Sequence, residues 1–166
     1  MLDEAGRRGS AAVSETIGHE SLPERLEIRI WLRLLSCTTQ IENIIKSKVR
    51  QEFGTSLARF DVLAQLDRFP EGLTMSEVSR HLMVSNGAIT GLVDKLAGCG
   101  WVVREEQAQD RRTVMVRLTE EGRAQFRLMA RRHEEWVVSL LGDLSREAQT
   151  ELLRDLTLLK RSLVTE

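Results

Sequence analysis

The fold is decided by residues 74–122, which read TMSEVSRHLMVSNGAITGLVDKLAGCGWVVREEQAQDRRTVMVRLTEEG. Thr74 and Glu77 have the spacing of a capping box, in which each side chain binds the other residue's backbone N–H, so a short helix is predicted to begin there. Ser85 is predicted to cap a second helix, because its hydroxyl can accept a free backbone N–H of the first turn. The first of these helices has an apolar stripe at spacings of three and four, made of Met75, Val78 and Leu82.

The predicted second helix has two chemically different faces. The inward face is apolar and consists of Ile89, Leu92, Val93 and Leu96. The outward face is small and polar and consists of Asn86, Gly87, Thr90, Gly91, Asp94 and Lys95. Small polar residues let a helix lie close to the edges of DNA bases and still offer hydrogen bonds. Each glycine costs a helix about 1 kcal/mol relative to alanine, which close approach to another surface would explain; the alternative is an ordinary exposed helix face.

The rest of this stretch is predicted to form two strands joined by a charged loop. Gly98 and Gly100 end the second helix, and the aromatic and β-branched residues Trp101–Val103 begin a strand. Residues 113–118 alternate with a period of two, as a half-buried strand does, and the polar loop 105–112 lies between the strands. We therefore predict a mainly α fold with a small β-hairpin wing: a winged helix-turn-helix, whose second helix reads DNA.

Three segments in this order carry a family resemblance: Ser85–Leu96, then Asp110-Arg111-Arg112, then Leu118-Thr119-Glu120-Glu121-Gly122. Together they resemble the MarR family of bacterial transcription regulators, and the resemblance extends from about Ser21 to the C-terminus. It implies a homodimer that binds palindromic double-stranded operator DNA. The implied DNA-binding residues are Ser85, Asn86, Gly87, Thr90, Lys95, Asp110, Arg111 and Arg112.

Two features of this resemblance concern individual DNA contacts. In the wing, Asp110 is expected to brace the hairpin and Arg112 to enter the minor groove, where the enhanced negative potential of a narrow groove favours a guanidinium. The alternative for these wing residues is a solvated hairpin tip. Gly91 departs from the family pattern, because many members carry a basic residue at that position.

The flanking segments set the predicted domain organisation. Residues 1–20 lack apolar periodicity and are predicted to form a mobile N-terminal arm. Residues 21–54 and 123–166 are predicted to be dimerisation helices, and residues 55–122 to be the winged helix-turn-helix DNA-binding domain. The first flanking helix opens with a capping box at Ser21–Glu24. Its apolar stripe consists of Ile30, Leu34, Ile41, Ile44, Ile45 and Val49.

The last flanking segment provides the argument for a dimer. Its predicted helix carries a leucine stripe that consists of Leu152, Leu153, Leu156, Leu159 and Leu163. A compact winged-helix domain has nothing left to cover this stripe. Two terminal helical segments around a DNA-reading centre therefore predict a twofold dimer.

Composition and motifs exclude several other classes. The formal charge is −1, from 24 basic and 25 acidic residues, so the DNA-binding prediction rests on where the charges lie and not on their sum. No apolar stretch has the length of a secretory signal or a membrane span, so we expect a cytoplasmic protein without membrane contact. The sequence has no phosphate loop, no nucleophile elbow and no cluster of metal ligands, so we predict no enzyme activity, no metal and no cofactor.

The cysteines, one histidine and two tryptophans each leave an alternative open. Cys37 and Cys99 cannot form a disulfide framework, and buried structural cysteines are the expectation, with redox sensing as the alternative. His133 lies on the apolar side of its predicted helix, where a core role is weighed against a ligand contact. For Trp31 and Trp136, a place in the core and a place in the lining of a ligand cavity are equally expected.

A narrower resemblance suggests the effector. Phe53–Asp61 and Leu82–Gly87 resemble the MarR members that repress aromatic-acid catabolism and respond to hydroxycinnamoyl-CoA thioesters. The implied function is a repressor that an aromatic acyl-CoA thioester releases from DNA. The implied ligand-binding residues are Arg29, Trp31, Arg33, Arg59, Phe60, Phe126, Arg131 and His133, with Arg132 as a further candidate cation. The alternatives are a regulator that senses oxidants or free aromatic acids, and a dimeric interaction protein without DNA binding.

Overall fold

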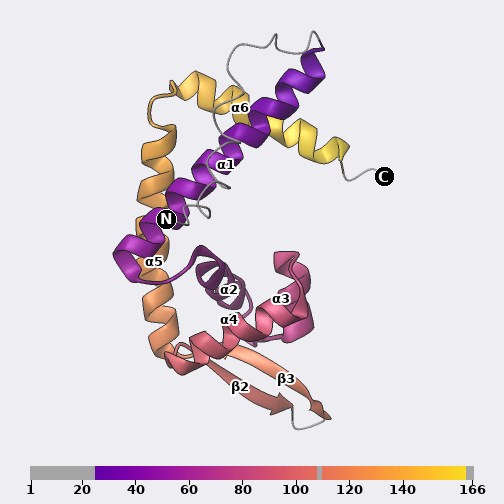
Figure 1. Ribbon diagram of the computed structural model, residues 1–166, viewed down its shortest axis with the longest axis vertical. Helices are drawn as coiled ribbons and strands as arrows, with labels where there is room; N and C mark the ends of the chain where they lie inside the picture. The colour runs from indigo at the N-terminus through magenta and orange to yellow at the C-terminus, as the bar shows by residue number, and fades with distance from the viewer. Residues whose placement is uncertain (1–24, 108–109, 164–166) are drawn as a thin grey trace, which may run out of the picture. The chain divides into compact units, whose positions relative to one another are not determined.

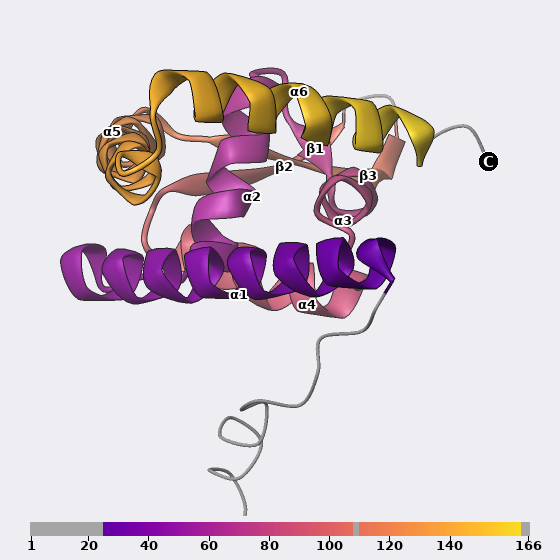
Figure 2. The same ribbon diagram turned by 90° about the horizontal axis from the view of Figure 1, so that it is seen from above.

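The computed structural model describes residues 25–107 and 110–163, with the backbone alone at residues 107 and 110–113. The predicted arm, residues 1–20, and the predicted cap at Ser21 lie outside the described residues. The chain divides into two compact units, residues 1–40 and 41–166, and the border falls inside α1. The elements follow in the order α1 (Leu26–Phe53), α2 (Leu57–Arg68), β1 (Leu73–Thr74), α3 (Met75–Leu82), α4 (Asn86–Gly98), β2 (Val102–Gln107), β3 (Asp110–Leu118), α5 (Glu120–Leu141) and α6 (Arg146–Ser162) (Figure 1 and, from above, Figure 2).

Hydroxyl groups begin five of the described helices, including the two for which the sequence predicts Thr74 and Ser85 as caps. Each accepts a hydrogen bond from the backbone N–H three residues later, which satisfies one of the free donors of the first turn. In the capping box, the backbone N–H and the hydroxyl of Thr74 both donate to Glu77 at 2.8 Å, and these bonds lower the pKa of the Glu77 carboxyl. The capping residues are Ser56, Thr74, Ser85, Thr119 and Ser145.

The sheet is larger than the predicted hairpin. It has three antiparallel strands in the order β1-β3-β2, because Leu73 and Thr74 pair with Val116 and Met115 of β3. The strands also run through most of the predicted loop, since β2 continues to Gln107 and β3 begins at Asp110. Backbone pairing extends along these strands although the residues beyond the core are polar, so no period-two pattern signals them.

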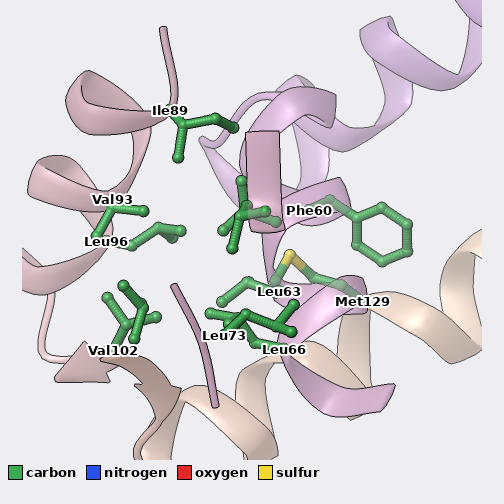
Figure 3. Packing of buried hydrophobic residues seen from close by; sticks show 12 residues of the cluster. Phe60, Leu63, Leu66, Leu73, Ile89, Val93, Leu96, Val102 and Met129 are labelled. Atoms are coloured by element: carbon green, nitrogen blue, oxygen red, sulfur yellow. The ribbon is translucent and has the colours of Figure 1, made fainter. Parts of the chain in front are cut away.

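The main hydrophobic core lies where α2, α4, the sheet and α5 meet. In Figure 3, side chains from these elements point toward one another around Leu63 and Leu66 of α2. Val62 is fully buried as well, although the sequence analysis did not select it. A close-packed core of this kind fixes the orientation of α4, because its inner face cannot rotate away without opening a cavity. The buried residues are Phe60, Val62, Leu63, Leu66, Leu73, Val78, Ile89, Val93, Leu96, Val102, Val116 and Met129.

The turn between α3 and α4 uses a residue that the sequence analysis did not single out. Met83 adopts a left-handed conformation, with φ +54°, which side-chain-bearing residues rarely do. Its backbone N–H donates to Arg80 O, and the N–H of Val84 donates to Ser79 O at 3.2 Å. These bonds satisfy the last carbonyls of α3 and set the angle at which α4 begins.

Two helices keep their apolar side chains exposed in the single chain. In α1 only Ile45 and Val49 are buried, so most of the predicted stripe is exposed, including Ile30, Ile41 and Ile44. In α6 no residue is buried. No helix in the described parts of the chain is both long enough and apolar enough to cross a membrane.

Among the glycines of the described residues, Gly122 makes the closest approach to another part of the chain. A Cβ built at this position would lie 1.9 Å from the carbonyl oxygen of Trp101, which is backbone and cannot rotate away. Two hydrogen bonds hold the same junction: Thr119 N donates to Trp101 O at 3.1 Å, and Thr119 Oγ1 donates to Gly100 O at 2.7 Å. The first turn of α5 therefore lies directly on the chain that links α4 to β2.

We predict that Gly122→Ala destabilises the protein by about 2 kcal/mol or more, because the added methyl forces two backbones apart. Gly98→Ala is the matched control, since a Cβ there meets nothing within 4 Å. Alanine inside a helix is favoured over glycine, so Gly98→Ala should be neutral or stabilise by up to about 1 kcal/mol. Urea unfolding measures both free energies. Equal midpoints for the two variants would show that the Trp101 contact does not constrain the fold.

Candidate nucleic-acid interface

Helix α4 turns its predicted reading face outward. Its inner residues Ile89, Val93 and Leu96 are completely buried, and this anchors the helix against α2 and the sheet. The helix N-terminus therefore has an exposed, uncovered face in the part of the chain that the structure describes. The predicted DNA-contacting residues of this segment are all exposed: Ser85, Asn86, Gly87, Thr90 and Lys95.

The polar groups at the start of α4 are arranged by local hydrogen bonds. Ser85 Oγ accepts from the backbone N–H of Ala88 at 3.3 Å, so the proton of the Ser85 hydroxyl is left to donate elsewhere. Thr90 Oγ1 donates to the carbonyl of Asn86 at 2.9 Å. Gly87 and Gly91 have nothing within 4 Å of an added Cβ, so packing within the chain does not require glycine at either position.

The wing is the second predicted contact. Figure 1 shows β2 and β3 as a hairpin beside α4, and Gln107 pairs with Asp110 next to the tip. The backbone of Asp110, Arg111 and Arg112 lies in β3, but their side chains lie outside the described part of the structure. Their bracing and minor-groove roles stay predictions.

An ion pair links α4 to the wing. Arg104 Nη1 in β2 lies 2.7 Å from Asp94 Oδ1 in α4. Sequence reasoning missed Arg104, because only the fold brings β2 alongside this turn of α4. An exposed pair of this kind adds little stability, but it offsets the negative charge of Asp94 on the face predicted to meet phosphate groups.

Part of the predicted effector site forms an aromatic cluster. The Phe60 ring of α2 stacks on the His133 ring of α5 with 5.1 Å between centroids, and it lies 5.6 Å from the Phe126 ring. Phe60 is buried, while Phe126 and His133 are half-buried. Burial lowers the pKa of the His133 imidazole, since the surroundings disfavour its charged form.

The predicted cations do not all join this aromatic cluster. Arg59 is half-buried and adjacent in sequence to Phe60, whereas Arg131 is exposed and lies roughly 200° around α5 from His133 at the helical repeat of 3.6 residues. Arg29, Trp31 and Arg33 belong to the unit formed by residues 1–40 and are exposed there. Of the predicted effector residues, the structure therefore brings Phe60, Phe126 and His133 together.

Arg132 is committed to interactions within the protein. Its Nε and Nη2 atoms lie 2.5 and 3.0 Å from the two carboxylate oxygens of Glu52, and a further nitrogen bonds Glu135. Its guanidinium also lies 5.9 Å from the centre of the Trp136 ring. The hydrogen bond from Arg132 is the main reason why the pKa of Glu52 is lowered. Arg132 therefore joins the C-terminal part of α1 to α5 and is unavailable to an effector phosphate.

The expectation of buried cysteines is wrong: Cys37 and Cys99 are both exposed in the single chain. Cys37 lies in the part of α1 that has no buried residue, and the apolar residues next to it in the sequence do not cover it. Cys99 follows the last turn of α4. The two tryptophans differ in burial: Trp136 is 6% exposed and belongs to the core, whereas Trp31 is 59% exposed.

We predict that acid weakens the fold through His133. The folded-state pKa of His133 lies below its ordinary value of 6.5. As the pH falls through that value, the unfolded chain takes up a proton that the folded chain does not, so stability is lost until the folded-state pKa is reached. His133→Phe removes this term and keeps a ring against Phe60. Urea unfolding at pH 7.5 and 5.5 should show a larger loss for the wild type than for the variant, and equal losses would contradict the assignment.

The sequence and the fold both have known relatives. Residues 53–113 match the MarR family model. A MarR family transcriptional regulator from Silicibacter pomeroyi is 30% identical, with a TM-score of 0.71 over 87% of this chain and 99% of that one. FabT of Streptococcus pneumoniae, solved in complex with DNA, is 29% identical, with a TM-score of 0.69 over 81% of this chain and 95% of FabT.

A further transcriptional regulator is similar to this chain in sequence. The HTH-type transcriptional regulator PecS of Dickeya dadantii is 34% identical over 107 residues, which are 63% of this chain and 64% of PecS. The chain thus spans just under two thirds of the length of PecS. These relatives are transcriptional regulators and not enzymes, as the sequence predicts. This chain belongs to the MarR family of winged-helix, DNA-binding transcriptional regulators.

Proposed function

We propose that this protein is a homodimeric repressor of an aromatic-compound catabolic operon, which an aromatic acyl-CoA thioester releases from palindromic operator DNA. The proposal that the protein responds to a ligand rests on the cluster of Phe60, Phe126 and His133. It lies on α2 and α5, and α2 packs against the inner face of α4 through the main core. A ligand that separated these rings would disturb the helices that hold the reading face.

The dimer part rests on the exposed apolar faces of the terminal helices. Leu156 and Leu159 of α6 are 39% and 38% exposed, and Trp31 of α1 is 59% exposed. Large apolar side chains left exposed along the helices of a single chain are typical of an interface. A twofold dimer would cover it and place two reading helices on one face of the duplex, so that the operator repeats in inverted orientation.

We predict a dimer in solution, with twice the 18.9 kDa chain mass by light scattering. Leu156→Asp should dissociate or unfold the protein, because it places a charge in an apolar interface. Leu158→Asp is the matched control, since it makes the same change roughly 200° around α6 from Leu156. A wild-type monomer that binds operator DNA would contradict the dimer.

The effector part rests on the chemistry of the aromatic cluster. Stacked rings prefer a planar aromatic partner, and the neutral form of His133, favoured by burial, suits an uncharged acyl group. Three described arginines are adjacent in sequence to these rings, and of them Arg127 is exposed, Arg132 is held by Glu52, and Arg59 is half-buried next to Phe60. A guanidinium there would meet a phosphate of the CoA part, since guanidinium groups bind phosphate bidentately.

Release follows from a difference in affinity. A ligand shifts a protein between two states only as far as it binds one of them more tightly. If the thioester favours a dimer whose reading helices no longer match one turn of DNA, about 34–36 Å, it must lower the affinity for the operator. The same factor must then appear in the reverse direction, so that operator DNA weakens thioester binding.

We predict this reciprocity for 4-hydroxycinnamoyl-CoA in calorimetric titrations with and without a duplex selected by the protein from random-sequence DNA. The thioester should bind more weakly to the DNA complex. His133→Ala should weaken thioester binding, and Arg59→Ala should weaken it without changing the affinity for free 4-hydroxycinnamate. Both variants should still bind DNA in the absence of ligand.

Other outcomes of these titrations point to the other functions. Equal thioester affinity in the two titrations overturns the release mechanism. Tighter binding of free 4-hydroxycinnamate than of its thioester would indicate a free-acid sensor. Release by hydrogen peroxide would indicate redox sensing, for which the exposed Cys99 at the end of α4 is the first residue to substitute. A dimer that selects no duplex would be an interaction protein without DNA binding.

A further inference from the structure

Thr90 lies on the face predicted to contact DNA, but its hydroxyl has no free proton to donate to a base. Thr90 lies in the second turn of α4 and is exposed, but its hydroxyl proton is already donated to Asn86 O at 2.9 Å. A hydroxyl has only one proton to donate. What Thr90 offers to DNA is therefore its methyl group and the remaining hydroxyl lone pair. In the major groove, a methyl group matches the C5-methyl of thymine.

The rest of the front of α4 lacks a guanine reader. Guanine is most often read by arginine or lysine through its O6 and N7 atoms. Residues 85–91 contain no charged side chain, and Lys95 comes a full turn later. Asp94, which could accept from cytosine, is held by Arg104 at 2.7 Å. Asn86 remains, and its amide suits the N6 and N7 atoms of adenine.

The surface on either side of Thr90 lets it approach the bases closely. Gly87 and Gly91 are its neighbours on the exposed face, and a Cβ at either position would meet nothing within 4 Å in the chain. Neither has the positive φ that would require glycine. Their absent side chains leave the Thr90 methyl standing out from the helix surface.

We propose that Thr90 reads a thymine through its methyl group, beside an adenine read by Asn86, so that A·T pairs lie under the first two turns of α4 in each half-site. This inference rests on the proposed function in requiring operator binding by α4. It names the base, and the atom on that base, that this residue recognises.

The test uses thymine and deoxyuridine, which differ only by the C5-methyl group. The full-length protein first selects a duplex from random-sequence DNA, and each thymine of its half-sites is then replaced in turn by deoxyuridine. At one position per half-site the affinity of the wild type should fall about fourfold, the effect of about 0.8 kcal/mol for one buried methyl group. Replacement in both half-sites should give about fifteenfold.

Two substitutions separate the methyl from the hydroxyl. Thr90→Ser keeps the hydroxyl and loses the methyl, so it should bind the thymine duplex more weakly and show no further loss on the deoxyuridine duplex. Thr90→Val keeps the methyl and should retain the full sensitivity to deoxyuridine. Because Thr90 is exposed, both variants should fold. The wild type and Thr90→Ser, each on the thymine and the deoxyuridine duplex, form a double-mutant cycle between one protein methyl and one DNA methyl.

Gly91→Ala tests the close approach independently. It should raise thermal stability, because alanine favours the helix, and it should lower DNA affinity at least tenfold. Gly98→Ala on the same helix is the matched control: it should raise stability and leave DNA affinity unchanged.

The outcomes distinguish this proposal from the proposed function. A selected duplex in which no deoxyuridine replacement matters, or in which Thr90→Ser is as sensitive as the wild type, overturns the thymine assignment and leaves operator binding intact. Failure of the wild type to select any duplex overturns operator binding and the assignment together.

Discussion

The contact between Gly122 and the backbone of Trp101 is the constraint on which the rest of the DNA-reading unit depends. It fixes the start of α5 against the short link between α4 and β2, with Thr119 bonded to both Gly100 and Trp101. This junction therefore holds the end of β3 next to the end of α4. The base of the hairpin is therefore anchored to the start of α5.

The core transmits this constraint to the reading helix. Leu63 and Leu66 of α2 pack against the inner face of α4, and Phe60 on the same helix packs against α5. One helix therefore contacts the DNA-reading element on one side and the aromatic cluster on another. Because close-packed side chains shift together, we expect a displacement of the rings around Phe60 to move the residues that support α4.

Charge is arranged locally, in agreement with a formal charge of −1 for the whole chain. Arg104 compensates Asp94 on the reading face, Arg123 pairs with Asp67 at 3.1 Å between α5 and α2, and Arg132 is held by Glu52. These arginines neutralise carboxylates of the scaffold. Because salt screens distant exposed charges, attraction to DNA depends on the cations nearest the duplex and not on the net charge of the chain.

The sequence by itself determined the helix starts, the reading face and the family. Caps such as Thr74 and Ser85 are local, since a hydroxyl and the N–H that it accepts from lie within one turn. Periodicity likewise separated Ile89 and Val93 from Asn86 and Thr90, because inner and outer positions recur at a fixed spacing along a helix. Only the tertiary structure decided which distant residues meet. In the folded chain β1 pairs with β3, and Arg104 forms an ion pair with Asp94. Arg132 forms an ion pair with Glu52, and Cys37 is exposed. Such contacts join residues far apart in the chain, or depend on what covers a surface, and no local pattern encodes them.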